Sequence, residues 1–253
     1  RNRSMARGKK ARARDEWSDS TPMGPRPSRV PPLHASLTNP RSILPPGSDS
    51  EFSSGEIAPV VTTLFEDDEG EPTMVVAAPL LTPAECAAWI AWGEANGFSL
   101  EQHAQTRHSA HRDNGRIALP SEQIAQAIFE RLTSAGVVPS VAEGRRACAC
   151  NPLIRLYKYV EGQRFGRHVD QSNHLADGSV TLFTVLLYLN GDFEGGETVF
   201  YESHWADHVA YRFAPKMGSV LVHAHGDRCL THEGAAVSRG TKYLLRTDVA
   251  YSR

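Results

Sequence analysis

The stretch "SVTLFTVLLYLNGDFEGGETVFY" at residues 179–201 contains two runs rich in β-branched, aromatic and other apolar residues, separated by a segment with three glycines. Such runs are typical of β-strands joined by a turn. More runs of this kind extend from residue 152 to the C-terminus, and Gly, Asp, Asn and Pro residues separate them. Many short strands with frequent turns predict a sandwich or a rolled barrel.

Upstream of these strands the sequence predicts two helices. In "MVVAAPLLTPAECAAWIAWGEANG" at 74–97, a strand-like run precedes a helix in which Thr82 is the N-cap, Glu85 completes a capping box and Gly97 ends the helix. A second helix is predicted to start after Ser121 and to stop at Gly136. We therefore expect an α+β domain, in which N-terminal helices pack on one sheet of a C-terminal β-barrel.

The first 56 residues differ from the rest of the chain. They hold eight of the sixteen prolines, and ten Lys or Arg residues against six Asp or Glu residues, in a chain whose net charge is −2. Because so few apolar residues cannot offset the entropy of ordering, we predict that residues 1–56 are disordered and that one domain spans 57–253. The basic residues 1–14 suggest a nuclear address or an anion-binding tail, and a solvated leader without function is an equally good interpretation.

We expect a cytoplasmic or nuclear protein, because no apolar run is long enough for a membrane span and no signal sequence is visible. The chain begins with Arg1 rather than methionine, so an upstream signal stays open. The four cysteines are Cys86, Cys148, Cys150 and Cys229, which form no disulfide framework in a chain of this size. We interpret the "CAC" pair at 148–150 as strand packing rather than as a metal site.

The segment "RFGRHVDQS" at 164–172 places His168 and Asp170 two residues apart. In an extended strand these side chains point to the same face. Two histidines and one carboxylate on one face of an iron ion form the facial triad of oxygenases. The downstream candidates for the third ligand are His174, His204, His208, His223, His225 and His232.

His232 is the favoured third ligand because a basic residue follows it at a useful distance. An oxygenase that uses a 2-oxo dicarboxylic acid must neutralise the far carboxylate with a buried cation. Lys242 lies ten residues beyond His232, and Arg246 shares its predicted strand face. Lys242 is our first choice for this cation and Arg246 the second.

Four segments, in this order, resemble the prolyl 4-hydroxylase type of iron(II)- and 2-oxoglutarate-dependent dioxygenase: "YVEGQRFGRHVD", "LLYLNGDFEGGETVF", "PKMGSVLVHAH" and "THEGAAVSRGTKY". The resemblance runs from about residue 75 to the C-terminus. It implies a double-stranded β-helix, which is a jelly roll with a cupin-like core, backed by helices. It also implies that "GGET" is a tight turn, in which Gly195 and Gly196 adopt backbone angles that other residues avoid.

The resemblance assigns roles to individual residues. It implies that His168, Asp170 and His232 are the iron ligands. Lys242 would bind the far carboxylate of 2-oxoglutarate (2OG) with help from Tyr159, and Thr184 is a weaker candidate for the same pocket. The cofactors would be Fe²⁺, 2OG and dioxygen, with L-ascorbate as a reductant.

One position departs from the family pattern. Many members have tyrosine three residues before the first iron histidine, where this chain has Phe165. The missing hydroxyl bears on how the second substrate is held. The arginine-rich segment 107–120 corresponds to the substrate entrance of this fold, so Arg112 and Arg116 either contact the substrate or form salt bridges.

The expected reaction is hydroxylation of an unactivated C–H bond, with succinate and CO₂ as coproducts. A peptidyl proline is the leading substrate, and the alternatives are a free amino acid, a small metabolite or another side chain. A non-catalytic metal-binding scaffold is a further alternative, but it predicts the loss of a ligand or of the basic anchor, and neither is lost. We expect a monomer that binds no membrane, and no nucleic acid except through its basic tail. We interpret the remaining histidines as surface or packing residues.

Overall fold

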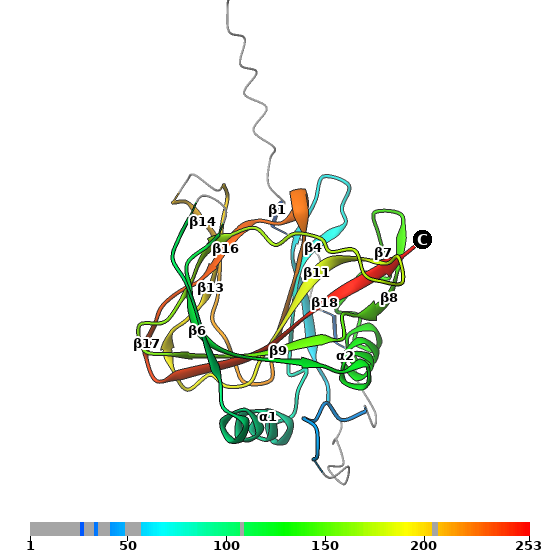
Figure 1. Cartoon of the computed structure of the whole chain (residues 1–253). Coiled ribbons are helices and arrows are strands. Elements are labelled where there is room, and N and C mark those ends of the chain that lie inside the picture. Colours follow the sequence, from blue (N-terminus) through cyan, green and yellow to red (C-terminus); the bar gives the residue numbers. More distant parts are fainter. Residues whose placement is uncertain (1–25, 28–32, 35–40, 49–56, 107–108, 204–206) are drawn as a thin grey trace, which may run out of the picture.

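The computed structural model describes all residues except 1–25, 28–32, 35–40, 49–56, 107–108 and 204–206 (Figure 1). The helices are α1 (Pro83–Asn96) and α2 (Glu122–Ser134), with one 3₁₀ turn at Gly226–Arg228. The strands are β1 (Arg26–Pro27), β2 (Leu33–His34), β3 (Val60–Glu66), β4 (Pro72–Ala78), β5 (Ser99–His103), β6 (Arg112–Pro120), β7 (Val141–Ala142), β8 (Arg145–Cys150), β9 (Leu153–Val160), β10 (Phe165–His168), β11 (Val180–Tyr188), β12 (Glu194–Gly195), β13 (Thr198–Tyr201), β14 (Val209–Phe213), β15 (Val220–Ala224), β16 (Thr231–Gly234), β17 (Val237–Arg239) and β18 (Thr241–Ser252).

Both helices begin and end as the sequence predicts. The Thr82 hydroxyl accepts a hydrogen bond from the Glu85 backbone N–H at 3.2 Å, and the Glu85 carboxylate accepts one from the Thr82 N–H at 2.8 Å. This capping box satisfies two N–H groups that have no partner inside the helix. Ser121 caps α2 in the same way, through the Ile124 N–H.

The strands predicted after residue 152 are all present, but the N-terminal part contains more strand than we expected. Strands β3, β5 and β6 lie where we predicted no strand. The arginine-rich segment 112–120 is β6, which pairs with β5, β9 and β10 rather than forming an entrance loop. Its alternation of polar and apolar residues is too weak to predict a strand from the sequence.

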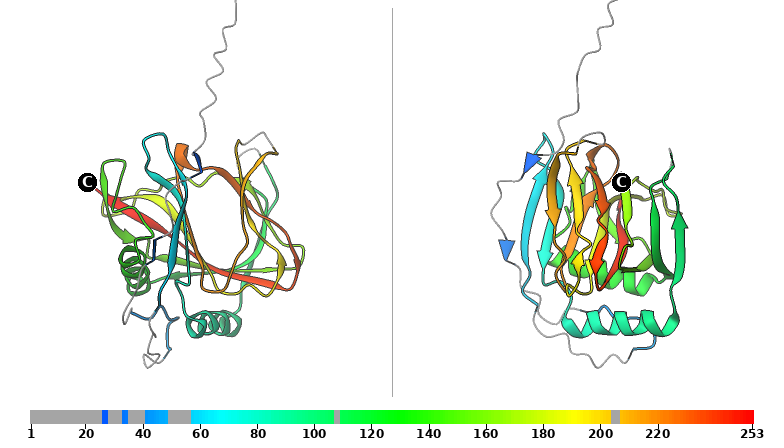
Figure 2. Two further views of the ribbon diagram at one scale, coloured as in Figure 1. Left: turned by 180° about the vertical axis from the view of Figure 1, so that it is seen from behind. Right: turned by 90° about the vertical axis from the view of Figure 1, so that its left-hand side faces the viewer.

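One antiparallel sheet curls into an incomplete barrel. Its strand order is β1-β3-β4-β15-β11-β18-β9-β6-β10-β16-β13-β14, and β12 and β17 form a separate two-stranded sheet. Figure 1 shows β13, β14 and β16 on one side of the barrel and β4, β11 and β18 on the other, with both helices below (Figures 1 and 2). This arrangement is consistent with a jelly roll.

The core has two parts because the central strand β11 is buried on both faces. Val185 and Leu187 point toward the helices, where they join Trp89 and Ile128. Leu186 and Tyr188 lie on the opposite face of β11 and point into the barrel. Alternate residues of a strand face opposite sides, so a strand covered on both sides reads as a continuous apolar run.

Residues 41–48 pack against the helices although they belong to the segment that we expected to be disordered. Ile43 is fully buried, its backbone N–H donates to Glu85 at 2.7 Å and its carbonyl accepts from the Trp89 indole at 2.9 Å. The ordered structure therefore includes residues before position 57. Most of the remaining residues of 1–56 lie outside the described part of the chain.

In the described part of the chain, neither helix has the length and hydrophobicity needed to cross a membrane. All four cysteines are free thiols. Cys148 and Cys150 lie in β8, as the strand interpretation predicts.

Candidate active site

His168 and His232 come together because their strands pair. His168 ends β10 and lies directly opposite His232 of β16 in the antiparallel register. Side chains at such positions share one face of the sheet, and the two ring centroids are 4.2 Å apart. The Nδ1 atoms lie 2.8 Å from the Gly166 carbonyl oxygen and 3.0 Å from the Leu230 carbonyl oxygen. This contact fixes the proton on Nδ1 and leaves the Nε2 lone pair of each ring for a metal ion.

Asp170 lies just beyond the end of β10 and reaches these histidines from there. The spacing predicts that His168 and Asp170 share a strand, but only His168 belongs to it. Its Oδ1 atom lies 3.6 Å from Nε2 of His168, and its Oδ2 atom lies 3.7 Å from Nε2 of His232. Possible ligand atoms of the three residues all lie within 4.8 Å of one another. Atoms bound to one ion at about 2 Å each are at most about 4 Å apart, so small adjustments suffice for binding.

The protonation states also suit a metal ion. Burial lowers the pKa of His168 to about 3 and also lowers that of His232, which keeps both rings neutral. Burial acts to raise the pKa of Asp170, but the charge of Arg246 holds it well below its usual range. The three groups therefore present two neutral nitrogens and a carboxylate, which are the protonation states that a metal requires.

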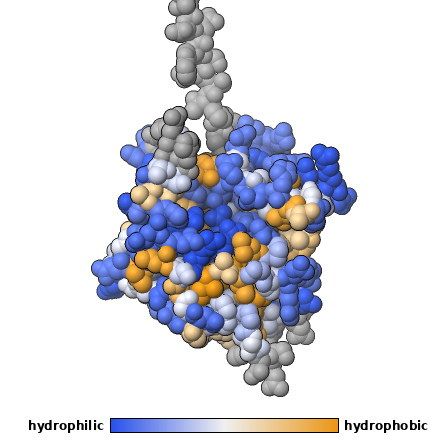
Figure 3. Space-filling model, viewed as in Figure 1, coloured by the Kyte–Doolittle hydropathy of each residue, from blue (hydrophilic) through white to orange (hydrophobic). Residues whose placement is uncertain are grey.

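A cavity opens in front of these residues. The residues that line it are Tyr157, Tyr159, Phe165, His168, Asp170, Leu186, Thr198, His223, His232, Gly234, Lys242, Leu244 and Arg246. Polar groups thus converge within a mostly apolar wall, which is typical of a ligand site. The face of the molecule in Figure 3 is mostly hydrophilic, with separate hydrophobic patches (Figure 3).

Lys242 is a buried cation inside this cavity. It lies on β18 opposite Tyr159 of β9, and its Nζ atom donates to the Gly196 carbonyl at 2.6 Å. Nζ also lies 5.5 Å from the ring centroids of Tyr159 and Tyr188. Burial lowers the pKa of Lys242 to about 7. Among the ion pairs of the described residues none involves Lys242, although the charge of Glu197 acts to raise the pKa of this amine.

Arg246, the other predicted cation, is already paired. Its Nη2 atom lies 2.9 Å from Asp170 Oδ1 and 3.6 Å from Asp248 Oδ1. Burial acts to lower the pKa of Arg246, but the two carboxylates raise it above its usual value. Arg246 therefore orients Asp170, a task that sequence reasoning missed.

Thr184 also acts on Asp170. Its hydroxyl donates to Asp170 Oδ2 at 2.6 Å and contacts His225 Nε2 at 2.8 Å. Thr184 is fully buried and is not among the residues that line the cavity. The structure thus places it behind the carboxylate, although the resemblance suggested the 2OG pocket.

The ring of Phe165 stacks on His168, with centroids 3.9 Å apart and planes inclined by 18°. The Arg112 guanidinium also lies over the Phe165 ring, 4.1 Å from its centroid. Arg112 and Arg116 both contact Glu101, at 3.4 Å and 2.5 Å, which agrees with the salt-bridge interpretation of these arginines. Only Arg112 is also placed beside the candidate metal site.

The remaining histidines differ in position. His174 is exposed, the exposed His208 lies 3.8 Å from Glu202, and His204 is outside the described residues. Nε2 of His225 lies 2.8 Å from the Thr184 hydroxyl. His223, which we interpreted as packing, lies on the cavity wall. The alternation in "HAH" was the available signal, but it does not tell which ring faces inward.

The residues present fit an iron ion. Nε2 of His168 is buried without a hydrogen-bond partner among the described residues, as expected for an atom that awaits a ligand. The donor set of two imidazoles and one carboxylate, with open positions facing a cavity, is typical of non-haem iron(II) oxygenases. A rolled β-barrel with this site defines the class of protein as an oxygenase.

Comparisons with known proteins support this class. Residues 154–247 match the model of the 2OG-Fe(II) oxygenase superfamily. The matched region contains His168, Asp170, His232 and Lys242, and this similarity together with the site supports a 2-oxoglutarate-dependent dioxygenase. No curated protein matches the chain.

Three solved structures illustrate the fold. A viral collagen prolyl hydroxylase from Paramecium Bursaria Chlorella virus-1 is 17% identical over 71% of this chain and 97% of its own, with a TM-score of 0.50. A 2OG-Fe(II) oxygenase family oxidoreductase from Burkholderia pseudomallei is 13% identical over 70% and 85%, with a TM-score of 0.50. A Trichoplax adhaerens prolyl hydroxylase in complex with a hypoxia inducible factor peptide is 18% identical over 70% and 83%, with a TM-score of 0.51. At these identities the likeness concerns the fold.

Proposed function

We propose that His168, Asp170 and His232 hold Fe²⁺, that Lys242 receives the far carboxylate of 2OG, and that the enzyme hydroxylates a peptidyl proline. The observation that carries the metal assignment is the convergence of two Nε2 atoms on one carboxylate at 3.6 and 3.7 Å. Bound Fe²⁺ supplies the oxidising chemistry, in which 2OG and dioxygen yield succinate, CO₂ and a hydroxylated product.

The chain contributes orientation and charge. The carbonyls of Gly166 and Leu230 hold the two imidazoles in the tautomer that binds metal. Arg246 and Thr184 fix the Asp170 carboxylate from two sides. These contacts fix the geometry of the site before any ligand arrives, which lowers the cost of binding.

Lys242 suits the far carboxylate because it is buried and forms no ion pair with the described residues. A carboxylate beside it would supply the missing counter-charge, and such charge-assisted hydrogen bonds are about twice as strong as neutral ones. The rings of Tyr159 and Tyr188 lie beside the amine, and Tyr159 lines the cavity. Arg246 is already held by two carboxylates, which favours Lys242 over it.

Two features support a proline-containing peptide. The neighbours from Paramecium Bursaria Chlorella virus-1 and Trichoplax adhaerens are prolyl hydroxylases, and the second is in complex with a peptide. In this chain, Phe165 offers a half-buried aromatic ring beside His168. Proline-containing segments bind aromatic-lined surfaces in several recognition modules.

The substrate proposal is tested by a succinate-release assay with Fe²⁺, 2OG and ascorbate. We expect release above the substrate-free rate with peptides that contain proline, and none with the same peptides in which alanine replaces proline. Stimulation by free amino acids alone would contradict a peptide substrate. Ascorbate is proposed as the reductant that keeps iron ferrous, so its omission should shorten the period of activity.

The metal assignment is tested separately. His168→Ala and His232→Ala should lose succinate release and bind Co²⁺ at least about 100-fold more weakly. His174→Ala removes an exposed histidine near the site and should behave as the unaltered protein. Unchanged Co²⁺ affinity in His168→Ala would overturn the assignment.

A further inference from the structure

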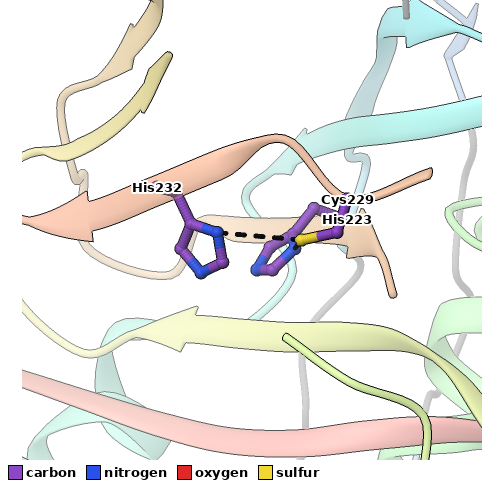
Figure 4. Close-up of side chains that lie close together, drawn as sticks. All are labelled: His223, Cys229 and His232. Carbon is purple, nitrogen blue, oxygen red and sulfur yellow. Dashed lines mark hydrogen bonds between the residues drawn. The ribbon is translucent and has the colours of Figure 1, made fainter. Parts of the chain in front are cut away.

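A third histidine faces the candidate metal site from the opposite side of the barrel. His223 lies on β15 and pairs in register with Thr184 of β11. Its side chain is buried, and it lines the cavity that contains His168 and His232. Figure 4 shows the rings of His223 and His232 close together, with Cys229 beside them (Figure 4).

His223 Nε2 approaches Asp170 as closely as the His232 nitrogen does. It lies 3.7 Å from Asp170 Oδ2, the same distance as Nε2 of His232. Like His168 Nε2, it is buried and has no hydrogen-bond partner among the described residues. Burying a polar atom without a partner is costly, so this nitrogen indicates a missing ligand.

The other nitrogen of His223 has acceptors nearby. Nδ1 lies 3.4 Å from the Ala224 carbonyl oxygen and 3.8 Å from the Cys229 sulfur. In the neutral ring, a proton on Nδ1 can be donated to these acceptors. The lone pair of Nε2 then points into the cavity. The ring centroids of His223 and His232 are 4.4 Å apart, close to the 4.2 Å between His168 and His232.

We propose that His223 is a fourth protein ligand of the metal ion while 2OG is absent, and that 2OG displaces it. The inference rests on the proposed function. An octahedral ion with three triad ligands has three positions left, and 2OG and dioxygen require all of them. His223 therefore occupies a position only in the resting protein, where it holds the ion more tightly and competes with 2OG.

Cys229 offers a different use of the same histidines. Its sulfur lies 3.8 Å from Nδ1 of both His223 and His232, and these three residues form a second set that could hold a metal ion. A soft ion such as Zn²⁺ would suit such a set. However, Nδ1 of His232 already contacts the Leu230 carbonyl at 3.0 Å, so this set would have to break the contact that orients His232.

The test uses Co²⁺ titrations of the full chain with and without saturating 2OG. In the absence of 2OG, His223→Phe should bind Co²⁺ at least about tenfold more weakly than the unaltered protein, and with 2OG the two affinities should be equal. By linkage, 2OG should bind the Co²⁺ form of His223→Phe more tightly by the same factor. The visible spectrum of unaltered Co²⁺ protein should change on adding 2OG toward that of the variant.

Cys229→Ala is the matched control, because it alters the other neighbour of His223 and should keep the unaltered affinities and spectrum. A thiolate-to-cobalt absorption band that disappears in Cys229→Ala would overturn the proposal in favour of the cysteine set. Equal Co²⁺ affinity of His223→Phe and the unaltered protein without 2OG would also overturn it. If His223→Phe does not fold, His223→Leu serves the same comparison.

The two proposals can fail separately. Loss of Co²⁺ binding in His168→Ala together with unaltered binding in His223→Phe would leave the triad intact and remove only the fourth ligand. Unaltered binding in His168→Ala would instead remove the triad itself.

Discussion

Lys242 and Arg246 lie on the same strand and line the same cavity, and their surroundings give them different tasks. Arg246 contacts Asp170 and Asp248, so its charge is already balanced. Lys242 contacts a carbonyl and two tyrosine rings, and burial lowers its pKa to about 7. A cation that is costly to keep charged in the free protein is well suited to bind a dianion.

Lys242→Met should raise the 2OG concentration needed for half-maximal succinate release by about 10- to 100-fold, because it removes one charge-assisted hydrogen bond. The 2OG affinity of the unaltered protein should also depend on pH. Above about pH 7 the free amine is mostly neutral, so binding takes up a proton and weakens by about tenfold between pH 6 and pH 8. Calorimetric 2OG titrations of the Mn²⁺ form check both points, and a persisting pH dependence in Lys242→Met would contradict the assignment.

Arg246→Met should weaken metal binding rather than 2OG binding. It removes a group that orients Asp170, and loss of such outer contacts lowers metal affinity by about 10- to 100-fold. We expect weaker Co²⁺ binding, with the 2OG requirement nearly unchanged once metal is saturating. If Arg246→Met raised the 2OG requirement and Lys242→Met did not, Arg246 would be the anchor.

At the scale of elements, the register between strands assembles the site. The β10–β16 pair places His168 opposite His232, and the β18–β9 pair places Lys242 opposite Tyr159. The "GGET" segment then brings the Gly196 carbonyl to Lys242. Gly195 and Gly196 have φ angles of 72° and 67°, as predicted, but Gly195 belongs to β12, so the segment connects two strands instead of forming the predicted tight turn.

Gly195→Ala should lower the free energy of unfolding by about 2–3 kcal/mol, because the left-handed backbone is strained for alanine and its Cβ would overlap the Ala236 carbonyl. Gly178→Ala is the matched control: its φ is 83°, but a Cβ there meets nothing within 4 Å. It should cost only about 1 kcal/mol. Urea unfolding measures both values, and equal losses would show that the close approach has no cost.

At the scale of the whole molecule, a buried ion pair joins the N-terminal segment to both helices. Arg131 of α2 donates two hydrogen bonds to Glu85 of α1, each at 2.8 Å. Arg131 also donates to the carbonyls of Leu80 and Arg41, and Glu85 accepts from the Ile43 N–H. This network holds residues 41–48 against the helices, on the side away from the cavity.

Arg131→Met should lower the free energy of unfolding by about 3–5 kcal/mol, because it leaves the Glu85 carboxylate buried without its partner. Glu130→Gln breaks only the exposed pair with Arg41, which spans 3.7 Å, and should change stability by less than about 1 kcal/mol. Thermal and urea unfolding test the difference. Metal affinity should stay unchanged in both variants, since neither residue lines the cavity.

Local signals in the sequence were sufficient for much of the fold. The caps Thr82 and Ser121 and the long apolar runs of β9, β11 and β18 are short-range features, and each appears where it was predicted. Strand β3 was not predicted although its β-branched run "VVTTLFE" is a local strand signal. Strands β5 and β6 were not predicted because their polar and apolar residues alternate weakly, and β6 pairs with the distant β9. For the same reason, the packing of Ile43 could not be read from a proline-rich segment.

The sequence by itself determined which residue types are available for the chemistry: the spacing of His168 and Asp170, the distant His232, and a basic residue ten positions later. Only the tertiary structure decided how they are used. It separated Lys242 from Arg246 by their partners, moved Thr184 behind Asp170 and turned His223 toward the cavity. The physical reason is that charge balance, desolvation and side-chain direction depend on strands that are far apart in the chain and meet only when the sheet curls.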